Sequence, residues 1–306
     1  MRRRICLILA WLLTLSATEL QAEIAQEFRA QQGVMNLSGR PVTQPLALAG
    51  EWRFAWQQLS DGSGSHDWPL FTMPSTWDEN GQAGYEYPGQ GYATFVLDIQ
   101  GLDPQVDWAL FVPEIATSFR LLANGRDILH GGRVGTSRQE VQPYQGNRWV
   151  RLGGIADGRL QLVLQVANYH HHSAGPWQPL LLGPEDQITR GYAQHVIYEA
   201  VILLLLLLIG LLLVMEYTVD RKDRTGLWLG LFTLMLGVRL GTTSFAPLYW
   251  MLSLNPPWEL HIRVIYISML VSPVLLFGWL HAAFGTDFSR SLRNLFSLPF
   301  LLAALL

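Results

Sequence analysis

Three acidic residues, Asp78, Glu79 and Glu86, lie in one short stretch rich in glycine and tyrosine. Carboxylates so close in sequence raise the question of glycoside hydrolysis, which needs two of them held at a defined separation across a sugar. Spacing along the chain does not establish such a pair. A solvated loop is the interpretation that the composition favours, and we predict no catalytic residue here.

Aromatic residues surround the same stretch and suggest ligand binding instead. Trp77, Tyr85 and Tyr87 offer flat apolar faces that can stack on the C–H side of a sugar ring. The alternative for each of them is burial in the core of the fold. We take Trp77, Asp78, Tyr85 and Tyr87 as candidate ligand-binding residues.

A run of three histidines, His170 to His172, is the second place where side-chain chemistry gathers. On a strand, His170 and His172 would share one face, and with His195 they could offer nitrogen ligands to a metal. No carboxylate or cysteine stands at a recognised ligand spacing, so we predict neither a metal nor a cofactor. His170 and His172 join the candidate ligand-binding residues, with plain surface histidines as the alternative.

The first residues of this 306-residue chain form a targeting segment. Three arginines at 2–4 precede an apolar run at 5–15, and Ala22 offers a small residue for cleavage. We therefore expect a signal peptide over 1–22 and export of the chain after it. The only cysteine, Cys6, lies in that segment, so the exported part has no disulfide. The net charge of −3 gives no basic excess for nucleic acid.

Short strands separated by turn residues fill the exported part, which we place at 23–190. Polar and apolar residues alternate over 92–99 and again over 159–166, as in strands with one buried face. Asn124-Gly125 is a strong signal for a two-residue hairpin turn. The pattern predicts an antiparallel β-sandwich.

The order of the sequence motifs carries a resemblance to a known family. Read together, they resemble the galactose-binding-like jelly roll, also found as the sugar-binding domain of family 2 glycosidases. They resemble still more the extracellular domain of the bacterial seven-transmembrane receptors with diverse intracellular signalling modules. One departure is Ala174-Gly175, where that family has paired glycines. The motifs, in chain order, are Gly50-Glu-Trp-Arg-Phe54, Met73-Pro-Ser-Thr-Trp-Asp78, Gly91-Tyr-Ala-Thr-Phe95, Val112-Pro-Glu-Ile-Ala-Thr-Ser-Phe119 and Val166-Ala-Asn-Tyr169.

The resemblance implies a sensory receptor whose jelly roll binds a small molecule, with a carbohydrate as one option. It also implies an output module after the seventh helix, such as a diguanylate cyclase or a histidine kinase, so this chain itself is not expected to be an enzyme. The bilayer is the other expected partner, and a homodimer through the membrane part or the output module stays open. A membrane-tethered carbohydrate-active hydrolase and an adhesion module are the alternatives.

Apolar stretches at 196–217, 225–247 and 261–284, and a further one starting at 295, come after the exported part. The first contains six consecutive leucines and is long enough to cross a bilayer. We predict an all-α transmembrane helix bundle over 191–306, three helices complete and a fourth cut, as part of a seven-helix unit. A simple tether needs only one helix, which favours signalling over anchoring.

Basic residues predict the orientation of these helices. Arg221, Lys222 and Arg224 follow the first helix, Arg290 and Arg293 follow the third, and the loop 248–260 has no Lys or Arg. By the positive-inside rule the first and third connections are cytoplasmic. The chain is then a multi-pass protein of the bacterial inner membrane with its N-terminal domain in the periplasm.

Glu199 in the first predicted helix and Arg239 in the second are charged residues that lie within membrane spans. A charge inside a bilayer is costly unless it pairs or extends to the surface. We predict that Glu199 and Arg239 form an intramembrane pair in one state of the protein, with an arginine that snorkels outward as the alternative.

The first testable prediction concerns topology. A reporter fused after Asp220 should show cytoplasmic activity, and one fused near Pro256 periplasmic activity, because the basic residues cluster beside the first position only. Paired reporters that work in opposite compartments would measure this. If both fusions report the same compartment, the three-helix arrangement is wrong.

Overall fold

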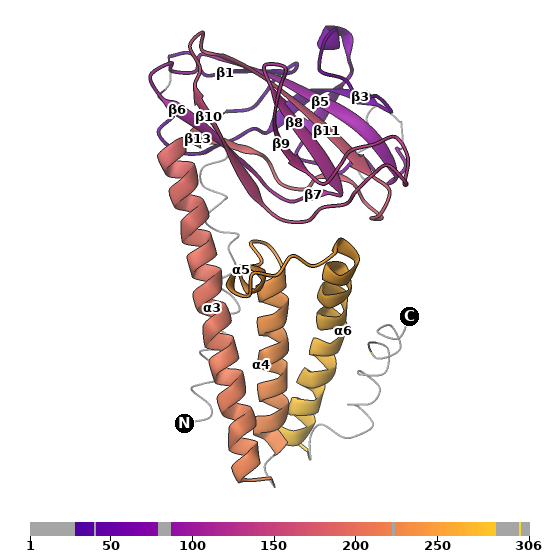
Figure 1. Cartoon of the computed structure of the whole chain (residues 1–306), viewed down its shortest axis with the longest axis vertical. Coiled ribbons are helices and arrows are strands. Elements are labelled where there is room, and N and C mark those ends of the chain that lie inside the picture. Colours follow the sequence, from indigo (N-terminus) through magenta and orange to yellow (C-terminus); the bar gives the residue numbers. More distant parts are fainter. Residues whose placement is uncertain (1–27, 40, 79–86, 222–223, 286–299, 301–306) are drawn as a thin grey trace. The chain divides into compact units, whose positions relative to one another are not determined.

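The computed structural model describes residues 28–39, 41–78, 87–221, 224–285 and 300. The chain divides into two compact units between Thr189 and Arg190. We call the first unit the head and the second the membrane unit. The head is built of β-strands and the membrane unit of helices, as Figure 1 shows. The predicted signal peptide over 1–22 and the fourth helix from 295 lie outside the described residues.

Two facing antiparallel sheets form most of the head, which confirms the predicted β-sandwich. The larger sheet has the order β4-β3-β5-β11-β8-β9, and β1 adds to β5 in parallel. Its strands are β1 (Val34–Asn36), β3 (Gly50–Trp56), β4 (Leu70–Met73), β5 (Gly91–Gln100), β8 (Ser118–Ala123), β9 (Arg126–Gly131) and β11 (Arg159–Asn168).

The smaller sheet has the order β10-β6-β13-β2, and a short pair, β7 with β12, lies outside both sheets. The bounds are β2 (Leu46–Ala47), β6 (Asp107–Val112), β7 (Ile115–Ala116), β10 (Arg148–Gly154), β12 (Gly175–Pro176) and β13 (Leu181–Pro184).

The strands with the clearest alternation occupy the centre of the larger sheet. β5 and β11 pair antiparallel along their whole length, from Gly91 opposite Asn168 to Gln100 opposite Arg159. The predicted hairpin joins β8 to β9, and both turn residues have positive φ, 48° at Asn124 and 75° at Gly125. That geometry matches the right-handed twist of the flanking strands, which is why the Asn-Gly signal is informative.

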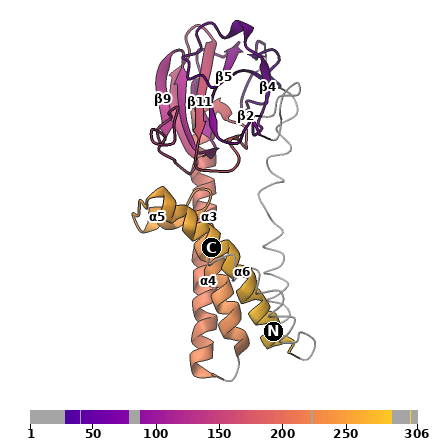
Figure 2. The same ribbon diagram turned by 90° about the vertical axis from the view of Figure 1, so that its right-hand side faces the viewer.

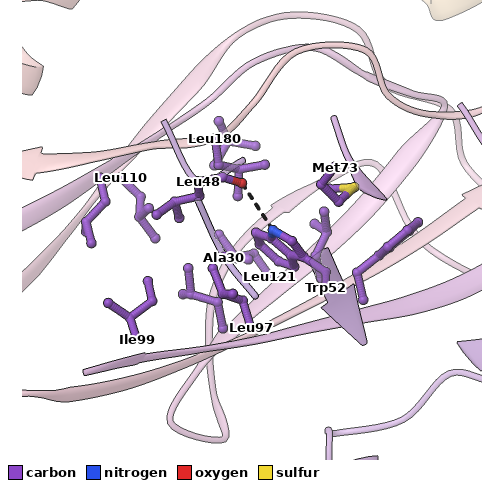
Figure 3. Packing of buried hydrophobic residues seen from close by; sticks show 14 of the residues in the cluster. Ala30, Leu48, Trp52, Met73, Leu97, Ile99, Leu110, Leu121 and Leu180 are labelled. Atoms are coloured by element: carbon purple, nitrogen blue, oxygen red, sulfur yellow. Dashed lines mark hydrogen bonds between the residues drawn. The ribbon is translucent and has the colours of Figure 1, made fainter. Parts of the chain in front are cut away.

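The core lies between the two sheets, and Trp52 of β3 is at its centre. The indole is fully buried, and its N–H donates to the Leu48 carbonyl oxygen at 3.1 Å (Figure 3). Because a buried N–H without a partner is costly, this bond allows a tryptophan to sit among aliphatic side chains. Leu97 and Leu121 of the larger sheet and Leu110 of the smaller one belong to the same cluster.

The outer face of the larger sheet is covered by the segment that comes after β3. Val96, Leu122 and Val163 are buried there and pack against Trp68. Arg53, also buried, donates to Asp98 at 2.6 Å and to the Ser65 hydroxyl at 3.2 Å. The middle of β5 is therefore buried on both faces: the core covers one face, and the segment with Trp68 and the Arg53–Asp98 ion pair cover the other.

Asn168, the last residue of β11, fixes the chain where it leaves the sheet. Its side-chain amide is fully buried and donates to the carbonyl oxygens of Gly89 at 2.8 Å and His171 at 2.7 Å. Its Oδ1 accepts the backbone N–H groups of His170 at 3.2 Å and His171 at 3.0 Å. One side chain thus holds the histidine run and joins it to the segment before β5.

The membrane unit contains three helices that are long and apolar enough to cross a bilayer: α3 (Glu185–Val219), α4 (Arg224–Thr242) and α6 (Trp258–Ala283). A short helix, α5 (Pro247–Met251), lies between α4 and α6. α3 begins eleven residues earlier than the predicted start at 196 (196 − 185), and α4 ends before the predicted 247. The chain turns at 243–246, where Ser244 and Ala246 adopt positive φ and end the helical geometry.

Glycines let α3 and α4 approach closely, and Figure 2 shows these helices side by side. A Cβ at Gly230 of α4 would lie 2.8 Å from the carbonyl oxygen of Gly210 of α3, and one at Gly241 would contact Leu203. Small residues at such positions are typical of helix contacts in lipid, where close van der Waals packing replaces the hydrophobic effect. On α6, Gly278 packs against Trp228 of α4 in the same way.

Asn168 gives a stability prediction. Asn168→Ala removes four hydrogen bonds and takes the partner from backbone groups that are partly buried, so unfolding of the head should cost on the order of 3 kcal/mol less. For a head of this size that corresponds to a Tm lower by roughly 6–12 °C. Asn36→Ala is the matched control, because the exposed Asn36 accepts a single local bond from the Ser38 N–H. Equal Tm values for the two variants in thermal unfolding would contradict the role given to Asn168.

Candidate functional site

Several connecting segments meet where β11 ends and β5 begins. The backbone N–H of Trp77 donates to the Ala174 carbonyl oxygen at 3.1 Å, and Gly175 pairs with Ala116 in the β7–β12 ladder. Gly89 lies against the His172 carbonyl, since a Cβ there would meet that oxygen at 2.0 Å. We call the described residues 74–78, 87–90, 113–117 and 169–177 the loop cluster.

Trp77 is in the loop cluster, but its ring is buried. The side chain is 0% exposed, its indole N–H donates to the Pro88 carbonyl oxygen at 2.9 Å, and its ring meets Trp56 edge-on at 5.2 Å. The expectation that Trp77 offers a face to a sugar is therefore corrected. The segment after β4 turns back over the core, and that course decides which way the ring points.

Asp78 and the histidine run, far apart in the chain, do come together. The Ser173 hydroxyl donates to Asp78 Oδ1 at 2.9 Å. Asp78 is half-buried, so its carboxylate remains within reach of solvent. Sequence reasoning missed Ser173, since a serine in a loop has no signal of its own.

The tyrosine candidates have different outcomes. Tyr87 is half-buried and packs on Phe54 at 5.3 Å and on Trp56 at 5.0 Å between ring centroids, so one side of its ring belongs to the core. Tyr85 lies outside the described residues, as do Glu79 and Glu86. Their place relative to Asp78 stays a prediction.

The histidines do not follow the alternation expected of a strand. β11 ends at Asn168, and the next residues turn around its side chain, so His170 and His172 are not paired on one strand face. Instead the rings of His171 and His172 are in contact at 4.2 Å, with His170 half-buried and His172 exposed. The condition for the metal interpretation, a strand that includes the histidines, is therefore not met, and the histidines lie just after the strand end.

An exposed tryptophan completes this group. Trp177 is 40% exposed and its ring lies 5.3 Å from that of His171. We call His171, His172 and Trp177 the aromatic surface. Sequence reasoning missed His171 and Trp177: nothing in the residue type separates Trp177 from the buried Trp52 and Trp108, and only the position of its ring shows the difference.

Two polar side chains of the loop cluster, Thr76 and Glu114, lie in surroundings that are unfavourable for polar groups. Thr76 is buried, and its hydroxyl has no hydrogen-bond partner in the described structure. Burial raises the pKa of Glu114 above that of an ordinary glutamate, and a hydrogen bond from Gln145 partly counters this effect. The aromatic surface adjoins Ser173, whose hydroxyl bonds the Asp78 carboxylate, and this combination is suited to a small ligand that has both apolar and hydroxyl faces.

No three His, Cys, Asp or Glu side chains gather as metal ligands within the part of the chain that the structure describes. His171 uses Nδ1 in a contact of 2.8 Å with the Ser173 carbonyl oxygen. His195 lies on α3, where its ring stacks on Phe245.

Glu199 and Arg239 do not form an ion pair in this structure. Glu199 Oε2 accepts the Phe245 N–H at 3.3 Å, and its carboxylate also bonds the Ser244 side chain. Arg239 is half-buried, and its Nη1 has no hydrogen-bond partner among the described residues. An arginine that snorkels outward stays the alternative. The sequence does not show that the Glu199 carboxylate would accept the backbone N–H of Phe245. Pairing in another state stays a prediction.

No protein-family model matches the chain, and no curated protein matches it. Among solved structures, it is similar to a beta-glucuronidase from Faecalibacterium prausnitzii, with 12% identity over 48% of this chain and 33% of that one, at a TM-score of 0.35. A glycosyl hydrolase family 2 member from Bacteroides cellulosilyticus is 12% identical over 46% and 20%, at 0.36. A family 2 beta-galacturonidase from Eisenbergiella tayi, bound to galacturonate, is 13% identical over 48% and 26%, at 0.33. The chain spans a third or less of each of these proteins, and at such TM-scores the likeness supports no conclusion about activity.

Proposed function

We propose that this chain is the sensory part of a membrane receptor. Its head is exported to the periplasm and binds a small ligand, with carbohydrates as the first class to test. Its helices belong to a multi-pass unit in the bacterial inner membrane that signals to a cytoplasmic output module. The observation that carries the proposal is the aromatic surface: Asn168 holds the backbone of His171, and the adjoining Ser173 bonds Asp78.

The ligand part of the proposal rests on how the loop cluster is built. Rings that are exposed and in contact with one another differ from single surface aromatics, which need no explanation. Here the half-buried His171 ring contacts two exposed rings, those of His172 and Trp177, and the next residue in the chain, Ser173, donates its hydroxyl to the Asp78 carboxylate. A sugar presents an apolar C–H face and hydroxyl donors, so it matches both features.

The membrane part rests on the three helices. One apolar helix would suffice to anchor a binding module, whereas α3, α4 and α6 are each long and apolar enough to span a bilayer. Glycine contacts between α3 and α4 show that the helices pack on one another. Helices that pack together can respond to a ligand by repacking, which a single anchor cannot do.

Binding without hydrolysis is the simpler proposal for the loop cluster. Both of its described carboxyl groups are engaged by neutral side chains, Asp78 by Ser173 and Glu114 by Gln145. Glycoside hydrolysis requires two carboxyl groups that face a sugar from opposite sides. We therefore propose that the chain itself is not an enzyme, and that a small ligand and the bilayer are its partners.

The aromatic surface gives the third prediction. Trp177→Ala in the full chain, held in lipid nanodiscs, should weaken binding of a responsive sugar about tenfold, or ~1.4 kcal/mol, because a stacking ring is lost. A panel of neutral hexoses and hexuronates, screened by intrinsic fluorescence and confirmed by calorimetry, provides the measurement. Trp149→Ala is the matched control, since Trp149 of β10 is exposed to a similar degree, 36%, and lies outside the loop cluster.

Two results would count against the proposal. A panel that binds nowhere on the wild-type chain would remove the carbohydrate class. Equal losses of affinity for the variants at Trp177 and Trp149 would show that binding does not involve the aromatic surface.

A further inference from the structure

Three side chains with polar or aromatic groups occupy one side of α3. Tyr192, His195 and Glu199 are spaced by three and four residues, which places them on the same helix face. All three contact the turn that joins α4 to α5, at residues 244–246. Tyr198 lies on another face of α3 and is 51% exposed.

The aromatic contacts enclose one residue of that turn. The His195 imidazole stacks on the Phe245 ring, with centroids 5.7 Å apart and planes 3° apart. The Tyr192 ring meets the same phenyl edge-on, at 5.1 Å and 74°. Phe245 is therefore held by two rings of α3 in the two geometries that aromatic pairs prefer.

Glu199 supplies the polar contact. Its Oε2 accepts the backbone N–H of Phe245 at 3.3 Å, and the carboxylate also bonds the Ser244 side chain. The N–H of a residue in a turn has no helical acceptor, and it needs a partner wherever water is scarce. A side chain of α3 thus accepts a backbone N–H of the turn.

The turn has an unusual backbone, which makes this support informative. Ser244 and Ala246, on either side of Phe245, have φ of 55° and 48°, a left-handed region that non-glycine residues seldom adopt. Ala246 is also the N-cap of α5 and makes no side-chain capping bond. Such conformations persist when the surrounding structure holds them in place.

We propose that Tyr192, His195 and Glu199 form a latch that holds the 244–246 turn against α3, with Glu199 as the residue that closes it. A movement of α3 is then passed to the outer end of α4 through this turn. The latch is a property of the membrane unit alone. The use of the latch in signalling rests on the proposed receptor function. In that function α3, which runs without a break from Glu185 to Val219, transmits movement along its length.

Ordinary helix packing would make a different prediction. If the contacts only filled space, the turn would stay in place when Glu199 lost its carboxylate, because the rings would still pack. If Glu199 closes the latch, its removal frees the Phe245 N–H and the turn moves away from α3.

Thiol cross-linking in native membranes can separate these cases, and the chain suits it because Cys6 is its only cysteine. In a Cys6→Ser background of the full chain, Val196→Cys with Ala246→Cys forms the test pair, because both positions adjoin the latch contacts and every latch side chain stays in place. Ile197→Cys with Ala246→Cys is the matched control, since Ile197 is 62% exposed and helical periodicity places it on the opposite face of α3. A short bifunctional thiol reagent is used, since a direct disulfide demands a narrower geometry. A protease site inserted after Asp220 lets linked fragments be told from unlinked ones on a gel.

The latch predicts linked fragments for the test pair and none for the control pair. Adding Glu199→Ala should slow linking of the test pair about fivefold, the effect of losing one hydrogen bond. Glu199→Gln keeps an oxygen that can accept the Phe245 N–H and should retain most of the linking. Glu216→Ala, near the other end of α3, should change nothing.

Equal linking of the test and control pairs would overturn the proposal, as would a test pair that is insensitive to Glu199→Ala. So would an equal loss for the alanine and glutamine variants, since the lost acceptor would then not be the cause. Because the assay uses no ligand, these outcomes concern the latch only, whereas a failure of sugar binding would concern the receptor proposal only.

Discussion

The antiparallel pairing of β5 with β11 is the constraint on which the rest of the head depends. Its ten residue pairs run from Gln100 opposite Arg159 to Gly91 opposite Asn168. Register in such a ladder is strict, since a shift by one residue would move Leu97 and Leu162 out of the core. The ladder therefore fixes which side chains meet the smaller sheet. It also fixes where the chain leaves the sheet, at Asn168.

The segment after Asn168 is a loop that several hydrogen bonds of the Asn168 side chain tie to the end of the sheet. The buried Asn168 amide bonds the carbonyl oxygens of both Gly89 and His171. The aromatic surface is therefore fixed in position by hydrogen bonds and ring contacts. Preorganisation of this kind lowers the entropy that a ligand must overcome. In the membrane unit a turn is also held by side chains from elsewhere in the chain. There, side chains of α3 contact the turn between α4 and α5.

Sequence patterns predicted the parts of the fold that depend on local periodicity. The alternation over 92–99 and 159–166, the Asn124-Gly125 hairpin and the three apolar helices correspond to β5, β11, the β8–β9 turn and α3, α4 and α6. The features that sequence patterns did not reveal depend on contacts between distant residues. The ring of Trp77 is buried because its segment turns back over the core, and Glu199 bonds a backbone N–H that no side-chain pattern reveals. The seven-helix unit and the output module stay predictions from the resemblance.

The loop cluster of the head is where we propose that a ligand binds. Amide hydrogen exchange on the full chain in nanodiscs, with and without the tightest-binding sugar, tests this most directly, because protection locates binding without any substitution. We expect slower exchange at 169–177 and at 87–90 and no change along β10, on the smaller sheet. Protection confined to the strands of the smaller sheet, with none in the loop cluster, would contradict the proposal.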